Sequence, residues 1–418
     1  MLASSNHARS PRVMMYSQDG FGLGHMRRTT SIARQLLALR PDACVLTLAD
    51  SRLGQFFESS EQHDYLKLPS ILKVGPGNWR AVSLPLPFAD VHTMRTELIR
   101  AAALSYRPDV LLVDHMPHGA MGELLPALEA LRAQGAGTQI VLGLRDILDA
   151  PETVRRRWEA EGAYEAIERY YDRVLVYGQR DVYDMAAHYG FSPAIAGRMR
   201  YTGYVCTPDV ARYPARARAK YLAGTAPGTK LLVAMAGGGA DAYPMMKALI
   251  EALPAIRVEQ PCELAVITGP FMPAELRRDL ETRARATRGA YVAITVSDPL
   301  SYIAAADLVY AMCGYNTTME IMRSTTPAVL IPRAGPSAEQ RTRARLFAER
   351  GWMEMVDPDE VSPAAIVDAT RRALAQGVVA RPRPDGLAAA AAELLALLPA
   401  VAPEPLELAL PGRVLRAA

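Results

Sequence analysis

Short apolar runs alternate with helix-like patterns along most of the chain. Within each run polar and apolar residues do not alternate, which indicates strands buried on both faces, as in a parallel sheet covered by helices. Between these runs, apolar residues recur at helical spacing, first over residues 25–39. Repetition of this unit predicts a doubly wound α/β domain up to about residue 200. Its predicted strands cover residues 12–17, 43–50, 109–115, 139–146 and 173–178.

The segment 199–216 contains glycine and prolines that break the pattern, and it predicts a linker. The alternation then restarts, with apolar runs beginning at residues 230, 262, 291, 300 and 327. Residues 386–398 form an alanine- and leucine-rich stretch of high helix propensity. We therefore expect an N-terminal Rossmann-like domain over residues 1–203, a C-terminal one over 204–380, and a final helix and tail over 381–418.

Composition excludes several classes of protein. A chain of 418 residues exceeds one ordinary core, which supports two domains. The net charge of +3 gives no argument for nucleic-acid binding. The four cysteines have no CxxC spacing, so neither a zinc site nor a disulfide framework is indicated. The first residues lack the apolar segment of a signal peptide, and no apolar run reaches the ~18 residues of a membrane span. We expect a cytoplasmic protein.

Two glycine-rich segments follow the first strand of each domain. They are "GFGLGH" (residues 20–25) and "AGGGAD" (residues 236–241). Open parallel sheets bind ligands at the carboxyl ends of their strands, and glycine lets backbone N–H groups approach an anion closely. We expect Gly22 and Gly24, together with Gly237, Gly238 and Gly239, to line a site for a phosphate-bearing ligand. The alternative is a plain strand-to-helix turn.

The first glycine segment matches neither common nucleotide fingerprint. It lacks the third glycine of GxGxxG and the Lys-Ser/Thr of a P-loop, which argues against a Rossmann oxidoreductase. It ends instead in His25, at the entrance of a predicted helix. Histidine titrates near working pH, so His25 is the candidate general base.

A second candidate site is "CGYNTTMEI", where a glycine opens a predicted helix. Asn316 and Thr317 are good capping residues, and Glu320 is favoured by the helix dipole. A capped helix explains these residues locally. The functional alternative is that Gly314 and the cap bind phosphate while the Glu320 carboxylate accepts ribose hydroxyls.

Polar side chains also follow two strands of the first domain. Asp114, His115 and His118 lie in one loop, but without a third histidine or an HExxH pattern we expect no metal. Acceptor-pocket residues, among them Asp114, His115 and Arg145, are the functional interpretation; simple polar loops, with Arg145 and Asp146 paired to each other, are the plain one. The apolar segment 69–88 could contact a membrane or an apolar acceptor, although burial under the first sheet is favoured.

Taken together, these segments resemble the GT-B glycosyltransferases of the MurG type and related bacterial enzymes. The resemblance covers both domains and is most specific over residues 13–30 and 230–346. The two glycine loops and the Gly314–Thr317–Glu320 spacing carry it. It implies a nucleotide-diphosphate sugar donor in the second domain, a UDP-sugar above all, and an acceptor in the first. It further implies that Glu339 and Gln340 grip donor-sugar hydroxyls.

The resemblance also implies how such an enzyme works. Retaining GT-B enzymes commonly carry a second glutamate eight positions before the first, but Met312 stands there, which favours inversion. Converging N–H donors would make a metal unnecessary, and no cofactor beyond the donor co-substrate is expected. The acceptor stays open between a glycan, a lipid-linked sugar and a small natural product, with peripheral membrane contact allowed. A sugar-nucleotide 2-epimerase or hydrolase of the same fold, and a non-catalytic nucleotide-sugar-binding protein, are the alternatives.

Overall fold

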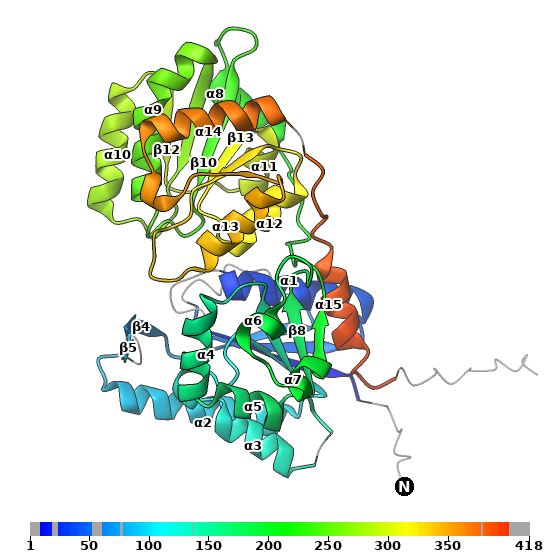
Figure 1. Ribbon diagram of the computed structural model, residues 1–418. Coiled ribbons are helices and arrows are strands. Elements are labelled where there is room, and N and C mark those ends of the chain that lie inside the picture. The colour runs from blue at the N-terminus through cyan, green and yellow to red at the C-terminus, as the bar shows by residue number, and fades with distance from the viewer. Residues whose placement is uncertain are drawn as a thin grey trace, which may run out of the picture.

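The computed structural model describes residues 9–18, 24–51, 61–75, 78–135, 137–377 and 379–400. Two lobes, each built on a parallel sheet, meet face to face (Figure 1). Within the described residues the sheet of the first lobe has seven strands, all parallel, in the order β3-β2-β1-β6-β7-β8-β9. These strands are β1 (Arg12–Ser17), β2 (Cys44–Ala49), β3 (His63–Lys67), β6 (Val110–Asp114), β7 (Gln139–Arg145), β8 (Arg173–Tyr177) and β9 (Met199–Tyr201).

Helices cover both faces of this sheet (Figure 1). Ile32 and Leu36 of α1 are fully buried, as expected for a helix whose apolar stripe packs on the strands. The helices of the lobe are α1 (Gly24–Leu39), α2 (Phe88–Tyr106), α3 (Leu125–Ala133), α4 (Pro151–Ala160), α5 (Ala163–Tyr170), α6 (Met185–Tyr189) and α7 (Pro193–Arg198), with a short 3-10 helix η2 (Ala120–Gly122).

The second lobe repeats this design. Its described sheet has six parallel strands in the order β12-β11-β10-β13-β14-β15. The strands are β10 (Lys230–Met235), β11 (Cys262–Ile267), β12 (Ala290–Ala293), β13 (Leu308–Ala311), β14 (Ala328–Leu330) and β15 (Glu354–Met355). The helices are α8 (Pro214–Leu222), α9 (Tyr243–Glu259), α10 (Ala274–Ala286), α11 (Pro299–Ala305), α12 (Tyr315–Arg323), α13 (Glu339–Glu349), α14 (Pro363–Gln376) and, beyond them, α15 (Gly386–Leu395), with a 3-10 helix η3 (Pro358–Glu360).

The α/β class and the two doubly wound parallel sheets are confirmed. The apolar segment 69–88 differs from the sequence prediction, because part of it forms an antiparallel hairpin of β4 (Ile71–Gly75) and β5 (Asn78–Ala81). Ile71 and Trp79 of this hairpin are buried beside α2, whereas Leu84 and Leu86, which follow it, stay 40% and 44% exposed. The segment is therefore only half buried. No helix in the described part of the chain is long and apolar enough to cross a membrane.

The chain passes between the lobes twice, and the two passes touch. The first pass follows β9, where the predicted boundary at residues 203 and 204 falls; the second precedes α15, which returns to pack against α1 (Figure 1). The Gly386 N–H donates to the Tyr204 carbonyl at 3.0 Å. A Cβ added to Gly386 would lie 2.3 Å from the Gly203 carbonyl oxygen, so only glycine allows this approach. An ion pair between Arg173 and Glu393, 2.6 Å long, fixes α15 to the first lobe.

Candidate active site

The start of α12 faces the start of α1 across the lobe interface. The Asn316 side-chain amide donates to the Gly24 carbonyl at 3.1 Å, which joins the two helix ends. Gly314 caps α12 with an extended backbone and no side-chain hydrogen bond. No described residue accepts a hydrogen bond from the backbone N–H groups of Tyr315, Asn316 and Thr317. These are the unsatisfied donors that make a helix start attractive to anions.

The glycines of the second-domain loop are required for two different reasons. Gly239 has a φ of +85°, and a Cβ there would lie 1.8 Å from the Thr268 carbonyl oxygen, so packing alone requires glycine. A Cβ on Gly238 would lie 3.0 Å from the Phe271 ring. Gly237, at φ +59°, would place its Cβ 3.6 Å from the Thr317 hydroxyl and is exposed. Gly237 is therefore the member of the three that lies beside the start of α12.

His25 forms a short hydrogen bond with a buried carboxylate. Its Nδ1 lies 2.5 Å from Asp114 Oδ2, and Arg28 binds both oxygens of that carboxylate at 2.7 to 3.2 Å. The His25 side chain is 19% exposed, whereas the Arg28 and Asp114 side chains are essentially buried. Burial works to raise the pKa of the Asp114 carboxyl, but Arg28 and His25 outweigh it and lower that pKa. Asp114 is thus an ionised acceptor, which places the His25 proton on Nδ1.

Arg28 is held between two aromatic rings, one from each lobe. Its guanidinium lies 5.3 Å from the Tyr177 ring centroid and 5.5 Å from that of Tyr315, the first residue of α12. The Tyr315 hydroxyl donates to the Tyr177 carbonyl at 2.8 Å and accepts the Val205 N–H at 2.9 Å. Arg343 lies on Tyr315 as well, at 5.5 Å. Because cation–π contacts strengthen when desolvated, this stack couples the His25 pair to α12.

His115 follows Asp114 in a strained conformation. Its φ is +76°, uncommon for a residue with a side chain, and its ring centroid lies 5.2 Å from that of His25. Burial, and then the nearby Arg145 charge, lower the pKa of His115 well below its ordinary value, so its imidazole is neutral. Neither the His115 Nδ1 nor the Arg145 Nε has a hydrogen-bond partner among the described residues. Both atoms are buried, and they supply unused polar capacity beside His25.

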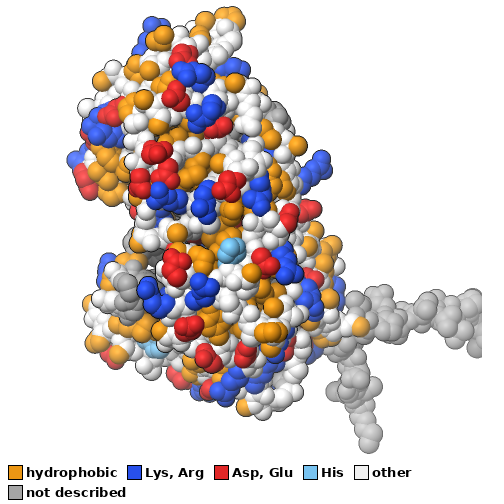
Figure 2. Space-filling model, viewed as in Figure 1, with side chains coloured by type: hydrophobic (Ala, Val, Ile, Leu, Met, Phe, Trp, Pro, Cys, Tyr) orange, Lys and Arg blue, Asp and Glu red, His pale blue; other side chains and the backbone are white. Residues whose placement is uncertain are grey.

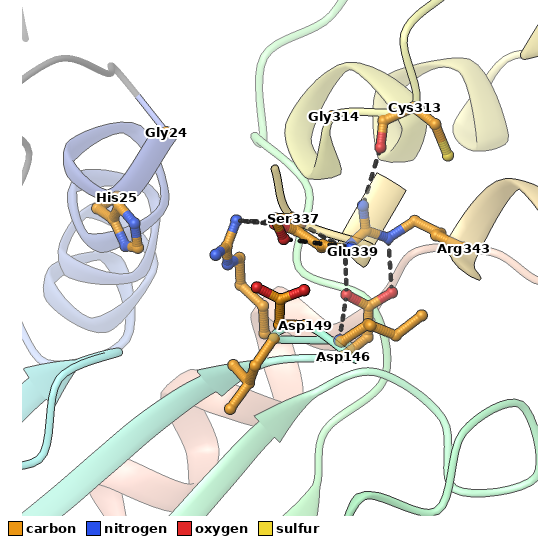
Figure 3. Close-up of polar contacts among 12 residues, drawn as sticks. Gly24, His25, Asp146, Asp149, Cys313, Gly314, Ser337, Glu339 and Arg343 are labelled. Carbon is orange, nitrogen blue, oxygen red and sulfur yellow. Dashed lines mark hydrogen bonds and ion pairs between the residues drawn. The ribbon is translucent and has the colours of Figure 1, made fainter. Parts of the chain in front are cut away.

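A network of buried charges joins the loop after β7 to α13 (Figure 3). Arg145 pairs with Glu339 at 2.9 Å, and Arg343 binds Asp146 through two nitrogens at 2.7 and 2.8 Å. Arg343 also binds Glu339 at 2.8 Å and the Cys313 carbonyl at 2.9 Å. Burial would raise the pKa of Glu339, but Arg145 and Arg343 together lower it. Arg145 and Asp146 therefore do not tie their own loop, as the plain interpretation had it; each pairs across the interface.

The two remaining donor-site candidates also have protein partners. Glu320 is buried and lies 2.6 Å from the Arg27 guanidinium of α1. Burial raises the pKa of Glu320, against the opposing effect of Arg27 and Arg323. The Gln340 side-chain oxygen accepts the Arg333 N–H at 3.2 Å. Charged side chains of both signs gather along the line where the lobes meet (Figure 2).

The structure brings most of the predicted site residues to this one interface. Gly24, His25, Asp114, His115 and Arg145 come from the first lobe; the second lobe contributes Gly237, Gly314, Asn316, Thr317, Glu320, Glu339 and Gln340, whereas Gly238 and Gly239 pack against Phe271 and Thr268 of their own lobe. Gly22 lies outside the described residues. Their individual roles stay predictions. Over the same described ranges no group of three or more His, Cys, Asp or Glu side chains is arranged to hold a metal.

Sequence reasoning missed the arginines that organise the site. Arg27 and Arg28 bind Glu320 and Asp114, and Arg343 binds Asp146 and Glu339. A weak signal existed, since Arg28 falls three residues after His25 and so lies on nearly the same helix face. Nothing in the sequence pairs Arg343 with a residue almost two hundred positions away.

Comparisons with known proteins agree with this architecture. Residues 232–395 match the glycosyltransferase family 28 C-terminal domain. The glycotransferase of kitacinnamycin is similar in structure at 18% identity and a TM-score of 0.58, with 93% of this chain and 96% of that chain covered. MurG of Acinetobacter baumannii is similar at 15% identity and a TM-score of 0.55 (92% and 95% covered). The UDP-GlcNAc 2-epimerase of Methanocaldococcus jannaschii is similar at 11% identity and a TM-score of 0.61 (92% and 99% covered). No curated protein sequence matches the chain.

The solved structures are too distant in sequence to show more than the fold, and that fold is the one expected. The family match adds the nature of the second lobe, since it spans β10 to α15. The predicted enzyme class, glycosyltransferase, is confirmed at the level of the family domain and the fold. The chain therefore has the GT-B glycosyltransferase fold, and its residues 232–395 match the glycosyltransferase family 28 C-terminal domain.

Proposed function

We propose that the protein transfers a sugar from a nucleotide-diphosphate donor to an acceptor hydroxyl, without a metal and with inversion at the anomeric carbon. The observation that carries this proposal is the short His25–Asp114 hydrogen bond at the start of α1, opposite the unsatisfied N–H groups at the start of α12. One helix start offers a base, and the other offers donors for a leaving anion. A UDP-sugar is the preferred donor, because several proteins of this fold carry UDP in their names.

In this mechanism His25 accepts the proton of the acceptor hydroxyl. Asp114 holds the proton on Nδ1, which leaves the lone pair on Nε2 free to take up the hydroxyl proton. The acceptor oxygen forms its bond to the anomeric carbon as the bond from that carbon to the diphosphate oxygen breaks. Imidazolium forms next to the Asp114 carboxylate, which stabilises the new positive charge. Arg28 shares that carboxylate and so limits the stabilisation.

The leaving diphosphate takes the electron pair of the broken bond. The N–H groups at the start of α12 and the exposed Gly237 lie together and offer preorganised donors for this charge. Removing one such donor from a comparable site typically costs about 10²- to 10³-fold in rate. Several donors converging on one anion are therefore enough to stabilise the leaving group.

The test combines binding with turnover. Thermal unfolding of the full-length protein with UDP, GDP and dTDP ranks the bases, because a ligand that binds only the folded state raises Tm. The corresponding labelled sugar nucleotides are then incubated with a panel of acceptors, and product linkage is determined by NMR. His25→Asn should keep the Tm shift and lose about 10²- to 10⁴-fold in transfer rate. His92→Asn, at a half-buried position of α2, is the matched control and should transfer at the wild-type rate.

Near wild-type transfer by His25→Asn would remove His25 from the reaction. The same experiment distinguishes the epimerase or hydrolase alternative, which needs no acceptor. That alternative is supported if the wild type releases nucleotide and an altered free sugar with acceptor absent. Binding without turnover on any acceptor would support a nucleotide-sugar-binding protein.

A further inference from the structure

Glu320, the carboxylate proposed to receive the ribose, is already occupied by a cation from the opposite lobe. Arg27 of α1 lies 2.6 Å from Glu320 Oε1, and the Glu320 side chain is only 3% exposed. The Arg27 side chain is 32% exposed, so it approaches from the solvent side and closes access to the carboxylate. Ribose hydroxyls can hydrogen-bond to Glu320 only after Arg27 has moved away.

The space beside this ion pair is too small for a nucleotide. The pocket there has a volume of about 220 Å³ even with its open mouth included, and Arg27, Arg28, Asn316 and Glu320 are among the residues that line it. Sites for small organic ligands usually measure about 300–1,000 Å³. Arg27 forms part of the wall, so its displacement enlarges the pocket and uncovers Glu320 in one movement.

Once displaced, Arg27 lies near Asp209, which already binds Arg34 and Thr207, and near the start of α12. Arg28, the other cation in the pocket wall, is committed to Asp114. Asn316 stands one helical turn before Glu320 on α12 and lines the same pocket, at the helix start where the diphosphate is proposed to bind. The amide of Asn316 already reaches Gly24, one turn before Arg27 on α1. A change of side-chain rotamer is therefore enough to move the Arg27 guanidinium from the Glu320 carboxylate to the start of α12.

We propose that Arg27 exchanges partners during donor binding: it pairs with Glu320 in the empty enzyme and with the donor diphosphate in the loaded one. This inference rests on the proposed function, because it takes a nucleoside diphosphate as the ligand of this site. Ribose then binds the carboxylate that Arg27 leaves, and the diphosphate binds the guanidinium. A nucleoside without phosphates can bind Glu320 through its ribose, but it must break the Arg27–Glu320 ion pair and offers Arg27 no anion in return. The exchange makes the diphosphate a requirement for tight binding.

The test compares UDP with uridine by isothermal titration calorimetry on the full-length wild type and Arg27→Gln. Guanosine and GDP, or thymidine and dTDP, replace the pair if that diphosphate raises Tm most. We expect Arg27→Gln to bind UDP about tenfold more weakly, the loss typical of one charge-assisted hydrogen bond. It should bind uridine at least as tightly as the wild type does, since no ion pair has to be broken. The ratio of the uridine Kd to the UDP Kd should therefore be at least about tenfold smaller in Arg27→Gln than in the wild type.

Arg34→Gln is the matched control. Like Arg27, Arg34 lies on α1 and binds an acidic residue from outside its lobe, Asp209. Unlike Arg27, it lies two turns further along the helix and does not line the pocket. Its Kd ratio should equal that of the wild type. Arg27→Lys keeps the charge and should retain most of the preference for UDP, which guards against misfolding of the glutamine variant. An unchanged ratio in Arg27→Gln, or an equal loss for UDP and uridine, overturns the exchange. Failure of the wild type to bind any of the diphosphates instead refutes the proposed function itself, and this inference with it.

Discussion

Replacing Arg343 with methionine tests the charge network at the lobe interface most directly. The Arg343 side chain is fully buried and binds Asp146 through two nitrogens at 2.7 and 2.8 Å and Glu339 at 2.8 Å. Methionine fills similar space but leaves Asp146 with one described donor, the Ile147 N–H at 2.8 Å. Breaking a buried pair by removing one partner costs about 3–5 kcal/mol, because the remaining charge is uncompensated. We expect Arg343→Met to lose that much unfolding free energy at neutral pH.

The loss should depend on pH with a definite sign. The pKa of Glu339 is lowered in the folded protein by Arg145 and Arg343 against the effect of burial. A lowered pKa contributes stability above the unfolded value of about 4.3, and that contribution disappears as pH falls through the folded pKa. Without Arg343 part of this contribution is absent from the start. The difference in unfolding free energy between wild type and variant should therefore be largest near pH 7 and should narrow as the pH falls below about 4.

Urea unfolding followed by circular dichroism, at a series of pH values, measures this difference. Arg345→Met is the control on the same helix: Arg345 is 66% exposed, lies 3.8 Å from Glu349, and should change stability by about 0.5 kcal/mol or less. Adding Asp146→Asn to Arg343→Met should recover part of the loss, since it removes the stranded charge. A loss below about 1 kcal/mol at pH 7.5, or one independent of pH, would show that the network does not hold the lobes as described.

Three further substitutions test separate parts of the structure. Gly239→Ala should lower the Tm far more than Gly224→Ala does. Both residues have positive φ, but a Cβ at Gly239 would lie 1.8 Å from a carbonyl oxygen, whereas a Cβ at Gly224 would have no atom within 4 Å. Equal decreases in Tm would contradict this packing. Tyr315→Phe should lose about 1–3 kcal/mol of unfolding free energy, because it removes two hydrogen bonds of the hydroxyl. Tyr315→Leu should lose more, because it also removes the ring that lies against two arginines. Identical losses would exclude a contribution from the ring. Arg95→Met should lose about 3–5 kcal/mol of unfolding free energy, because the buried Glu123 carboxylate would lose a partner bound at 2.5 and 2.6 Å. Urea unfolding measures this loss. A smaller loss would show that other groups compensate the Glu123 charge.

The strands and the lobes could be predicted because buried parallel sheets leave a strong local pattern. The run 12–17 and the helix pattern from residue 25 correspond to β1 and α1 within one residue. The hairpin of β4 and β5 could not be found in the same way, since its strands are short and its apolar residues serve packing against α2 instead of a sheet core. Local periodicity reports which residues are buried, not which element buries them.

The candidate site was predictable where chemistry follows a strand end. His25, Gly314 and Glu320 could be chosen as candidates because residue type and position agree with a known kind of site. Their partners were not, because an ion pair such as Arg27 with Glu320 joins residues distant in sequence and close only after both lobes have folded. The three glycines at 237–239 show the opposite difficulty: glycine required by packing against Thr268 and glycine suited to a ligand look alike in sequence.

The contact between Gly203 and Gly386 has a consequence for engineering this enzyme. The two segments that connect the lobes lie side by side at this point, so the second lobe is joined to the first by two chain crossings. A chimera that exchanges the second lobe alone must therefore be spliced at two junctions, near residues 203 and 386, and must keep the host's own terminal helix. A chimera with a single crossover would replace the α15 that packs against α1 of the first lobe with the α15 of another protein.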